Sequence, residues 1–349
     1  MKIRRASILL SLLSMLFIAG PAAAQEIPDW VNRTKISGLA FGDYYDVAAN
    51  HDESLEGRNG FWFRRIYLTF DFEVDEDVDF RLRLEAASGD GFVTSSRIEP
   101  FAKDAWVRYK PGNQSMYFGI SSTPTWGTVE KEWGYRAVEK TPLDLQKMGS
   151  SRDFGLAAKG PLDGAGKIFY HAMVGNGSST SVETNSGKSA YLALGVKPAD
   201  GFTFEVYGDF NELPGDADTY TVQAFGAWNG EGGRLGVLYA RRWMETGPDT
   251  KIDLDIFSVY GVLAASDKVS VFGRFDHMFD PNPSAGGISY LPMSPDAKSN
   301  FALAGVDFAV SDHFSIIPNV ETVFYDAIGT AAEAPDTDVV PRITFSLTF

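Results

Sequence analysis

The chain has 349 residues, with 46 acidic against 31 basic side chains and a net charge of −15. This acidity argues against a nucleic-acid-binding protein, because neutralising phosphates requires a basic face. The absence of cysteine excludes a disulfide scaffold, a thiol nucleophile and a cysteine-based metal site. With only four histidines, side-chain metal chemistry is also sparsely supplied, and we expect no cofactor or metal.

Residues 1–24 have the pattern of a cleaved secretory signal peptide. The first five residues carry three basic side chains, residues 8–18 are mostly apolar, and positions 22–24 are alanines suited to cleavage. The apolar stretch is too short to cross a ~30 Å hydrocarbon core as a helix. We therefore predict an exported protein that begins at Gln25 and carries a net charge of −18, since the removed segment holds three basic residues and no acid.

The rest of the chain alternates apolar and polar residues with a period of two, the pattern of strands with one apolar and one polar face. In residues 78–86, for example, every even position is apolar and every odd position is charged. Sixteen strands are predicted, at 34–45, 60–73, 78–88, 98–110, 114–121, 151–160, 166–175, 189–198, 202–212, 219–229, 233–244, 252–264, 268–278, 299–310, 313–325 and 337–349.

The connections distinguish a membrane barrel from a soluble sandwich, since both would alternate. Tight turns such as 75–77, 111–113 and 199–201 alternate with longer links. Tight turns on one side, long loops on the other and an even strand number indicate an all-β, closed antiparallel up-and-down transmembrane barrel. Closure pairs every backbone group in lipid, and sixteen strands leave an aqueous lumen. We predict a single barrel over 25–349 in the bacterial outer membrane.

The longest link, residues 122–150, is predicted to fold inward and narrow the lumen. Connections of nearly thirty residues are usually functional or disordered. This link contains Trp126, Trp133 and Leu143, which is too much apolar material for a solvated tail. An outward lid is the alternative.

Strand parity assigns the pore-lining residues. Four arginines face inward on neighbouring strands, and the loop offers four acids, so a transverse field across the narrowest section is expected. The expected constriction residues are Arg65, Arg81, Arg83, Arg108, Glu130, Glu132, Glu139 and Asp144. As an alternative, the arginines pair with Asp71, Asp79, Glu85 and Asp104 and merely solvate the lumen. By the same parity, Arg64 would face lipid near the rim.

Several segments resemble the phosphate-selective porin O and P family. They are Arg65-Ile66-Tyr67-Leu68, the stretch from Lys103 to Lys110, Gly119 to Pro124, Ser151 to Leu156, Gly175-Asn176-Gly177 and Gly273 to Asp276. The resemblance implies a sixteen-stranded homotrimeric porin whose third loop forms the constriction, and it adds Arg152, with Arg108, as a pore residue. It does not extend to phosphate, because phosphate-selective members resemble one another in a basic pore path and this lumen carries both signs.

The chain ends on Phe349 in an alternating aromatic strand. Bacterial outer-membrane proteins resemble one another here, which implies recognition by the barrel-assembly machinery. The other expected partners are membrane lipid, lipopolysaccharide and small solutes or ions.

We expect passive diffusion of small hydrophilic solutes and ions through the outer membrane. A phosphate- or anion-selective channel with an arginine track and a plugged structural or adhesive barrel are the alternatives. An enzyme is not expected, because no Gly-x-Ser-x-Gly or His-Glu-x-x-His motif occurs. Residues 280–283 could hold calcium at the rim, but their composition favours a solvated loop.

Overall fold

The computed structural model describes residues 29–89, 92, 97–215, 217–247, 250–328 and 333–349. The predicted signal peptide and its cleavage site lie outside these residues. The chain divides into two units, Met1–Thr34 and Lys35–Phe349. The described part of the first unit is the short helix α2 (Asp29–Asn32) and the residues that follow it, where the Thr34 hydroxyl donates to the Trp30 carbonyl at 2.7 Å.

The second unit is built from strands, and all sixteen predicted strands are confirmed with shifts of a few residues at their ends. They are β1 (Thr34–Asp46), β2 (Asn59–Glu73), β3 (Val78–Ala86), β4 (Phe101–Tyr109), β5 (Ser115–Ser122), β6 (Arg152–Pro161), β7 (Ile168–Gly175), β8 (Ser189–Val196), β9 (Phe202–Asn211), β10 (Thr219–Gly230), β11 (Gly233–Glu245), β12 (Lys251–Ser266), β13 (Val269–Met278), β14 (Lys298–Ser311), β15 (Phe314–Asp326) and β16 (Asp338–Thr348).

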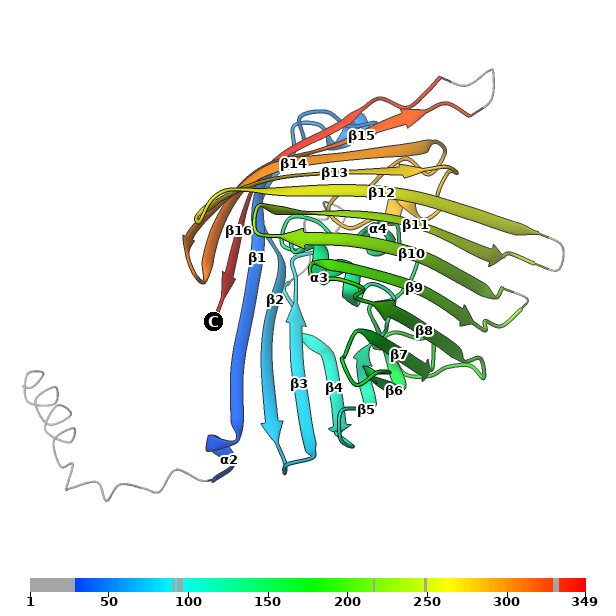
Figure 1. Ribbon diagram of the computed structural model, residues 1–349. Helices are drawn as coiled ribbons and strands as arrows, with labels where there is room; N and C mark the ends of the chain where they lie inside the picture. The colour runs from blue at the N-terminus through cyan, green and yellow to red at the C-terminus, as the bar shows by residue number, and fades with distance from the viewer. Residues whose placement is uncertain (1–28, 90–91, 93–96, 216, 248–249, 329–332) are drawn as a thin grey trace, which may run out of the picture. The chain divides into compact units, whose positions relative to one another are not determined.

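The strands form a closed antiparallel barrel in which each pairs with its neighbours in sequence (Figure 1). The ring closes where β1 pairs with β16, with Tyr44 opposite Ile343. Beyond the last paired strand residue, Gly38 and Phe349 exchange two backbone hydrogen bonds of 2.9 and 3.1 Å. A Cβ on Gly38 would overlap the ring of Phe349 in its present position, so the ring packs directly over this glycine. Closure leaves the barrel without an edge strand.

The two faces of the barrel differ in burial as the alternation predicts. In β8, exposed and buried residues alternate without exception. Large apolar side chains such as Phe118, Leu156 and Val259 point outward and are exposed, whereas the opposite parity faces the interior. This outward apolar band suits contact with lipid.

The interior is partly filled by two connections. The long loop, residues 123–151, carries α3 (Gly127–Trp133) and α4 (Pro142–Leu145), and Figure 1 shows both helices in the space that the strands enclose. Gly134 ends α3 in the left-handed conformation, with φ of 72°, and Pro142 begins α4, where a missing N–H costs nothing. None of the helices in the described residues is long and apolar enough to cross a membrane.

The second inward loop, residues 279–297 with η3 (Ala285–Gly287), was not predicted. The expectation of a solvated loop at 280–283 is wrong at its centre, because Asn282 is 2% exposed and donates to the Gln146 carbonyl at 2.8 Å. Ile288, Leu291 and Met293 of this loop join the same buried apolar cluster as the long loop. Both loops therefore pack together inside the barrel.

The buried cluster fills one side of the interior. On the strand wall it contains the inward residues of β10 to β15, among them Phe225, Leu238 and Ile256. The Trp133 ring lies against Tyr260 and Phe272, with ring centroids 5.1 and 6.1 Å away. The space left open lies toward the other wall.

Candidate pore section

A basic cavity of about 450 Å³ remains between the long loop and the inward faces of β1 to β6. Its polar lining is dominated by cations, with two acids on the loop side. The charged lining residues are Arg65, Arg83, Lys103, Glu130, Arg136, Asp144 and Arg152. The cavity lies beside the long loop and is thereby the candidate narrow section of the channel.

Two buried carboxylates position the four cations of the wall. The Glu85 carboxylate forms ion pairs with Arg65 Nε at 2.9 Å and with Lys103 Nζ at 3.1 Å. Asp104 pairs with Arg83 at 3.3 Å and also with Arg152. The two carboxylates are only 4% and 3% exposed, whereas the four cations are 15–25% exposed. Each acid therefore sits behind two cations, and the wall presents positive charge to the cavity.

Irregularities in two strands bring extra cations to this wall. In β2, Ile66 pairs with Ala86, but the Phe63 carbonyl accepts from the Ser88 N–H. Residues 64 and 65 therefore face a single residue, Ala87, directly after β3, which is a β-bulge that turns both side chains inward. The expected lipid-facing position of Arg64 is accordingly wrong, since this residue is buried.

The second irregularity lies between β3 and β4. Their register shifts at Arg83, so that Arg83 faces Asp104 and the next residue of β3 faces Ala102. Lys103 is thus the extra residue, and it lines the cavity together with Arg83. A shift of this kind re-aims a side chain that strict alternation would point the other way.

The loop side of the cavity carries one arginine between two acids. Arg136 Nε lies 3.2 Å from Glu130 and its Nη2 lies 3.6 Å from Asp144. Burial lowers the pKa of Arg136, but Asp144 and Glu130 raise it by more, so the guanidinium stays charged. With two acids for one base, this side is the more negative one, opposite a wall with four cations and two buried acids.

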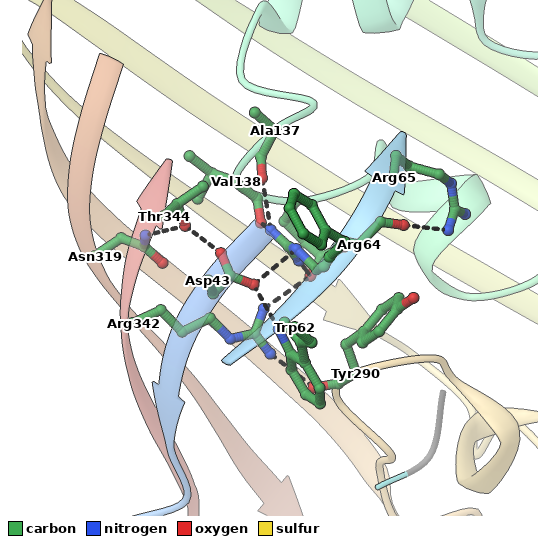
Figure 2. Close-up of polar contacts among 12 residues, drawn as sticks. Asp43, Trp62, Arg64, Arg65, Ala137, Val138, Tyr290, Asn319, Arg342 and Thr344 are labelled. Carbon is green, nitrogen blue, oxygen red and sulfur yellow. Dashed lines mark hydrogen bonds and ion pairs between the residues drawn. The ribbon is translucent and has the colours of Figure 1, made fainter. Parts of the chain in front are cut away.

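A buried ion network, the loop anchor, ties the long loop to the wall (Figure 2). Arg64 Nε pairs with Asp43 at 2.9 Å and its Nη1 pairs with Glu139 at 3.2 Å. The same guanidinium donates to the backbone carbonyls of Ala137, at 2.7 Å, and Val138. Burial raises the pKa of Glu139, but Arg64, Lys140 and Arg342 lower it further, to about 2.

Arg342 extends the loop anchor to the second inward loop. It pairs with Glu321 at 2.9 Å and lies 3.7 Å from Glu139. It also donates to the Tyr290 carbonyl at 2.7 Å (Figure 2). Tyr290 itself has φ of +68°, a conformation that non-glycine residues adopt at a cost. One buried cluster therefore holds both inward loops against β1, β2 and β16.

The predicted constriction residues divide into two groups. Arg65, Arg83, Arg152, Glu130 and Asp144 line the basic cavity together. The remaining four, Arg81, Arg108, Glu132 and Glu139, lie outside this cavity.

Arg81 pairs with Asp71 at 2.6 Å, and Arg108 pairs with Asp79; both lie nearer the turn between β2 and β3. Glu132 lines a different cavity and accepts from Thr203 at 3.4 Å. Glu139 is buried in the loop anchor.

The four arginines expected by parity all have acidic partners, as the alternative prediction held. Pairing does not remove them from the lumen, because at Arg65 and Arg83 the acid is buried behind the cation. The expected constriction set did not include Arg64, Lys103 and Arg136. Arg64 and Lys103 each adjoin a second charged residue within a strand, as Arg64-Arg65 and Lys103-Asp104, whereas Arg136 lies in the long loop, where strand parity does not apply.

Residues 38–190 match the phosphate-selective porin O and P family, which confirms the resemblance noted from the sequence. No curated protein matches the chain significantly. Among solved structures, an anion-selective porin from Comamonas acidovorans is similar with a TM-score of 0.66 and 11% identity, covering 90% of this chain and 99% of that one.

Two further structures are similar. OmpF of Salmonella typhi, in complex with daunomycin, has a TM-score of 0.63 and 13% identity, covering 90% of this chain and 97% of that one. A trimer form of OmpT from Vibrio cholerae has a TM-score of 0.59 and 11% identity, covering 90% and 98%. At these identities the likeness concerns the fold.

Proposed function

We propose that the chain is an outer-membrane channel with a porin barrel and that the basic cavity is its selective narrow section. The match of residues 38–190 to the phosphate-selective porin O and P family and the likeness to solved porin barrels support this proposal. Solutes pass down their own gradient, in a channel rather than an enzyme. Between the loop and the wall, a transverse field orients dipolar solutes and slows apolar ones.

The observation that carries this proposal is the order of charges on the wall. Glu85 and Asp104 are buried behind four cations, so a passing solute meets guanidinium and ammonium groups first. The acids Glu130 and Asp144 on the loop moderate this field. A general pore for small hydrophilic solutes with a modest preference for anions follows, and phosphate is not singled out.

Reversal potentials under a potassium chloride gradient test this proposal. The wild-type channel should prefer chloride modestly, and Arg83→Met combined with Lys103→Met should move the reversal potential toward potassium. Arg81→Met is the matched control, because Arg81 pairs with Asp71 outside the cavity. A potential that the double variant leaves unchanged would place selectivity elsewhere.

We further propose that copies of the chain associate, as a trimer, through the wall of β3 to β8. Strands β5, β7 and β8 have only eight residues. At ~3.3 Å per residue and a tilt of about 40°, eight residues span roughly 20 Å, short of the ~25 Å apolar band of an outer-membrane barrel. Opposite them, β12 has 16 residues. A second copy would cover the short wall, whose outward side chains Phe118 and Leu156 are exposed.

Oligomer size after extraction in mild detergent tests the association. Phe118→Asp should release monomers, whereas Val259→Asp, on the opposite wall, should leave the oligomer intact. Monomers from the wild-type protein would contradict the proposal.

The remaining partners also stay proposals. Lipid and lipopolysaccharide would surround the longer wall, and the β16 strand ending at Phe349 would be recognised by the barrel-assembly machinery. Export through a cleaved signal peptide over residues 1–24 would deliver the chain.

A further inference from the structure

A second cavity, of about 560 Å³, adjoins the basic cavity and shares its lining residues Ser122, Thr123 and Gly127. Its volume lies within the roughly 300–1,000 Å³ typical of small-molecule sites. The wall of this cavity comes from β6 to β9, with Lys159, His171 and Glu205 among its lining residues. A solute that leaves the basic cavity along the long loop would enter it.

Glu205 is a buried carboxylate that has no cationic partner among the described residues. It is 4% exposed, and its one hydrogen bond comes from the Thr128 hydroxyl on α3, which leaves Oε1 without a partner in the described residues. An uncompensated buried charge is costly unless another group pairs with it. When Glu205 is ionised, no cation in the described part of the chain compensates its charge, so a cationic group of a solute would stabilise it.

Asp153, on the same wall, shows how a buried acid is normally satisfied. It too is buried and pairs with no cation in the part of the chain that the structure describes. It accepts from the backbone N–H groups of Phe154 and Gly177, both at 2.8 Å, and from the Tyr191 hydroxyl at 3.0 Å. Hydrogen bonds within the protein therefore satisfy the buried Asp153 carboxylate. Glu205 is different because its free oxygen lies at a cavity.

Lys159 supplies the opposite charge to the same cavity. Its ammonium lies 4.7 Å from the centre of the Tyr117 ring, and within the residues described it forms no ion pair with an acid. In the strand ladder, Lys159 pairs with His171, His171 with Ala193 and Ala193 with Tyr207, two residues from Glu205. Three strand spacings of ~4.8 Å put the two Cα atoms roughly 15 Å apart.

We propose that this second cavity binds a small zwitterion, with its ammonium on Glu205 and its carboxylate on Lys159. The two unpaired charges have opposite signs, line one cavity and do not pair with each other. An extended solute with both charges would reach both residues when the Lys159 side chain turns from the Tyr117 ring toward the cavity. This inference rests on the proposed channel, and it adds a solute class that the basic cavity, where acids and cations already pair, does not select.

The inference is tested with the full protein in a planar bilayer. Glycylglycine is added, and the concentration that blocks half of the potassium chloride current is measured. Glu205→Gln and Lys159→Met should each raise the half-blocking concentration by about tenfold or more, because each leaves one solute charge unpaired in a buried site. Glu212→Gln, at the exposed end of β9, should leave it unchanged.

Two analogues separate the charges. N-acetylglycylglycine lacks the ammonium, so its block should not respond to Glu205→Gln. Glycylglycine amide lacks the carboxylate, so its block should not respond to Lys159→Met. Equal half-blocking concentrations of glycylglycine in the wild type and both variants would overturn the zwitterion site.

The channel itself can fail separately from this site. If the wild-type protein does not conduct, the proposed function fails, and calorimetric titration of the detergent-purified protein with glycylglycine then decides the inference. Heat of binding that is lost in both variants supports the site, and the absence of binding to the wild type refutes it. If Glu205→Gln does not assemble, Lys159→Met alone carries the test.

Discussion

One half of the barrel interior is packed with apolar side chains, whereas the other half is open space lined by charged side chains. Toward β10 to β15, inward side chains such as Phe225 and Ile256 pack against apolar residues of both inward loops. Toward β2 to β6, inward side chains such as Arg65 and Arg83 line open space. The outer faces of both halves are similarly apolar. The lipid therefore dictates the outer face of every strand, while the inward residues decide whether the lumen is packed or aqueous.

Hydrophobic burial explains which half is filled. Apolar wall residues gain free energy when loop residues such as Leu143 and Met293 cover them, at about 25 cal/mol per Å². A wall of arginines gains nothing from such a cover and loses hydration. The loop anchor with Arg64 and Arg342 marks the border between the halves, where charges are buried but paired.

The largest expected effect comes from emptying the filled half. Replacing residues 281–296 by a short Gly-Ser linker removes the second inward loop, so the single-channel conductance should rise several-fold. Shortening the connection at 179–187, between β7 and β8, is the control and should leave the conductance unchanged. An unchanged conductance in the first variant would mean that this loop does not obstruct the path.

At the border, Arg64→Met should lower the free energy of unfolding by about 3–5 kcal/mol, because it leaves Asp43 and Glu139 buried without their main cation. Arg81→Met removes the partly exposed ion pair with Asp71, on the open side of the lumen. It should lower the free energy of unfolding by about 0–1 kcal/mol. Urea unfolding in lipid vesicles measures both. Equal losses would show that the loop anchor is no stronger than a lumen-facing pair.

Within the filled half, Leu143→Ala should cost about 2–5 kcal/mol, since the side chain is fully buried. Leu156→Ala removes the same atoms from the exposed outer face of β6 and should cost less in the same vesicles. A larger loss of unfolding free energy for Leu156→Ala than for Leu143→Ala would contradict this prediction.

The smallest effect concerns pH. The pKa of Glu139 is lowered from 4.5 to about 2, so its contribution to anchoring the loop is complete above about pH 4.5 and is lost as the pH falls toward 2. Channel noise should therefore increase as the pH is lowered from 5 to 3. Glu139→Gln should remove this increase. Noise that stays the same between pH 5 and 3 in the wild type would contradict the assigned ion pairs.

Strand parity predicted the barrel because the membrane imposes a period of two on every strand. It failed where a single residue breaks that period. At Arg64 and Lys103 a bulge turns two neighbouring charged residues to the same side, and alternation assigns one of them to lipid. Adjacent charges within a strand accompany both bulges, but Arg241-Arg242 in β11 keep a regular register with β12, so this pattern alone does not identify a bulge.

The second inward loop escaped prediction for a different reason. Its apolar residues are separated by proline, glycine and serine, so residues 279–297 resemble a turn-rich surface loop. The signal lay in the wall, where residues 235–240 of β11 are apolar on both faces. A strand buried on both sides needs a cover inside the barrel, but the wall sequence does not identify the segment that provides it.

Cysteine accessibility tests the division of the lumen most directly, because the chain has no cysteine of its own. Ser122→Cys places a thiol on the lining of both cavities, and Ser258→Cys places one on the inward face of β12, where the serine is 1% exposed. A negatively charged methanethiosulfonate reagent should reduce the current through Ser122→Cys in steps and leave Ser258→Cys unaffected. Rapid modification and block of Ser258→Cys would show that the solute path runs through the half described as filled.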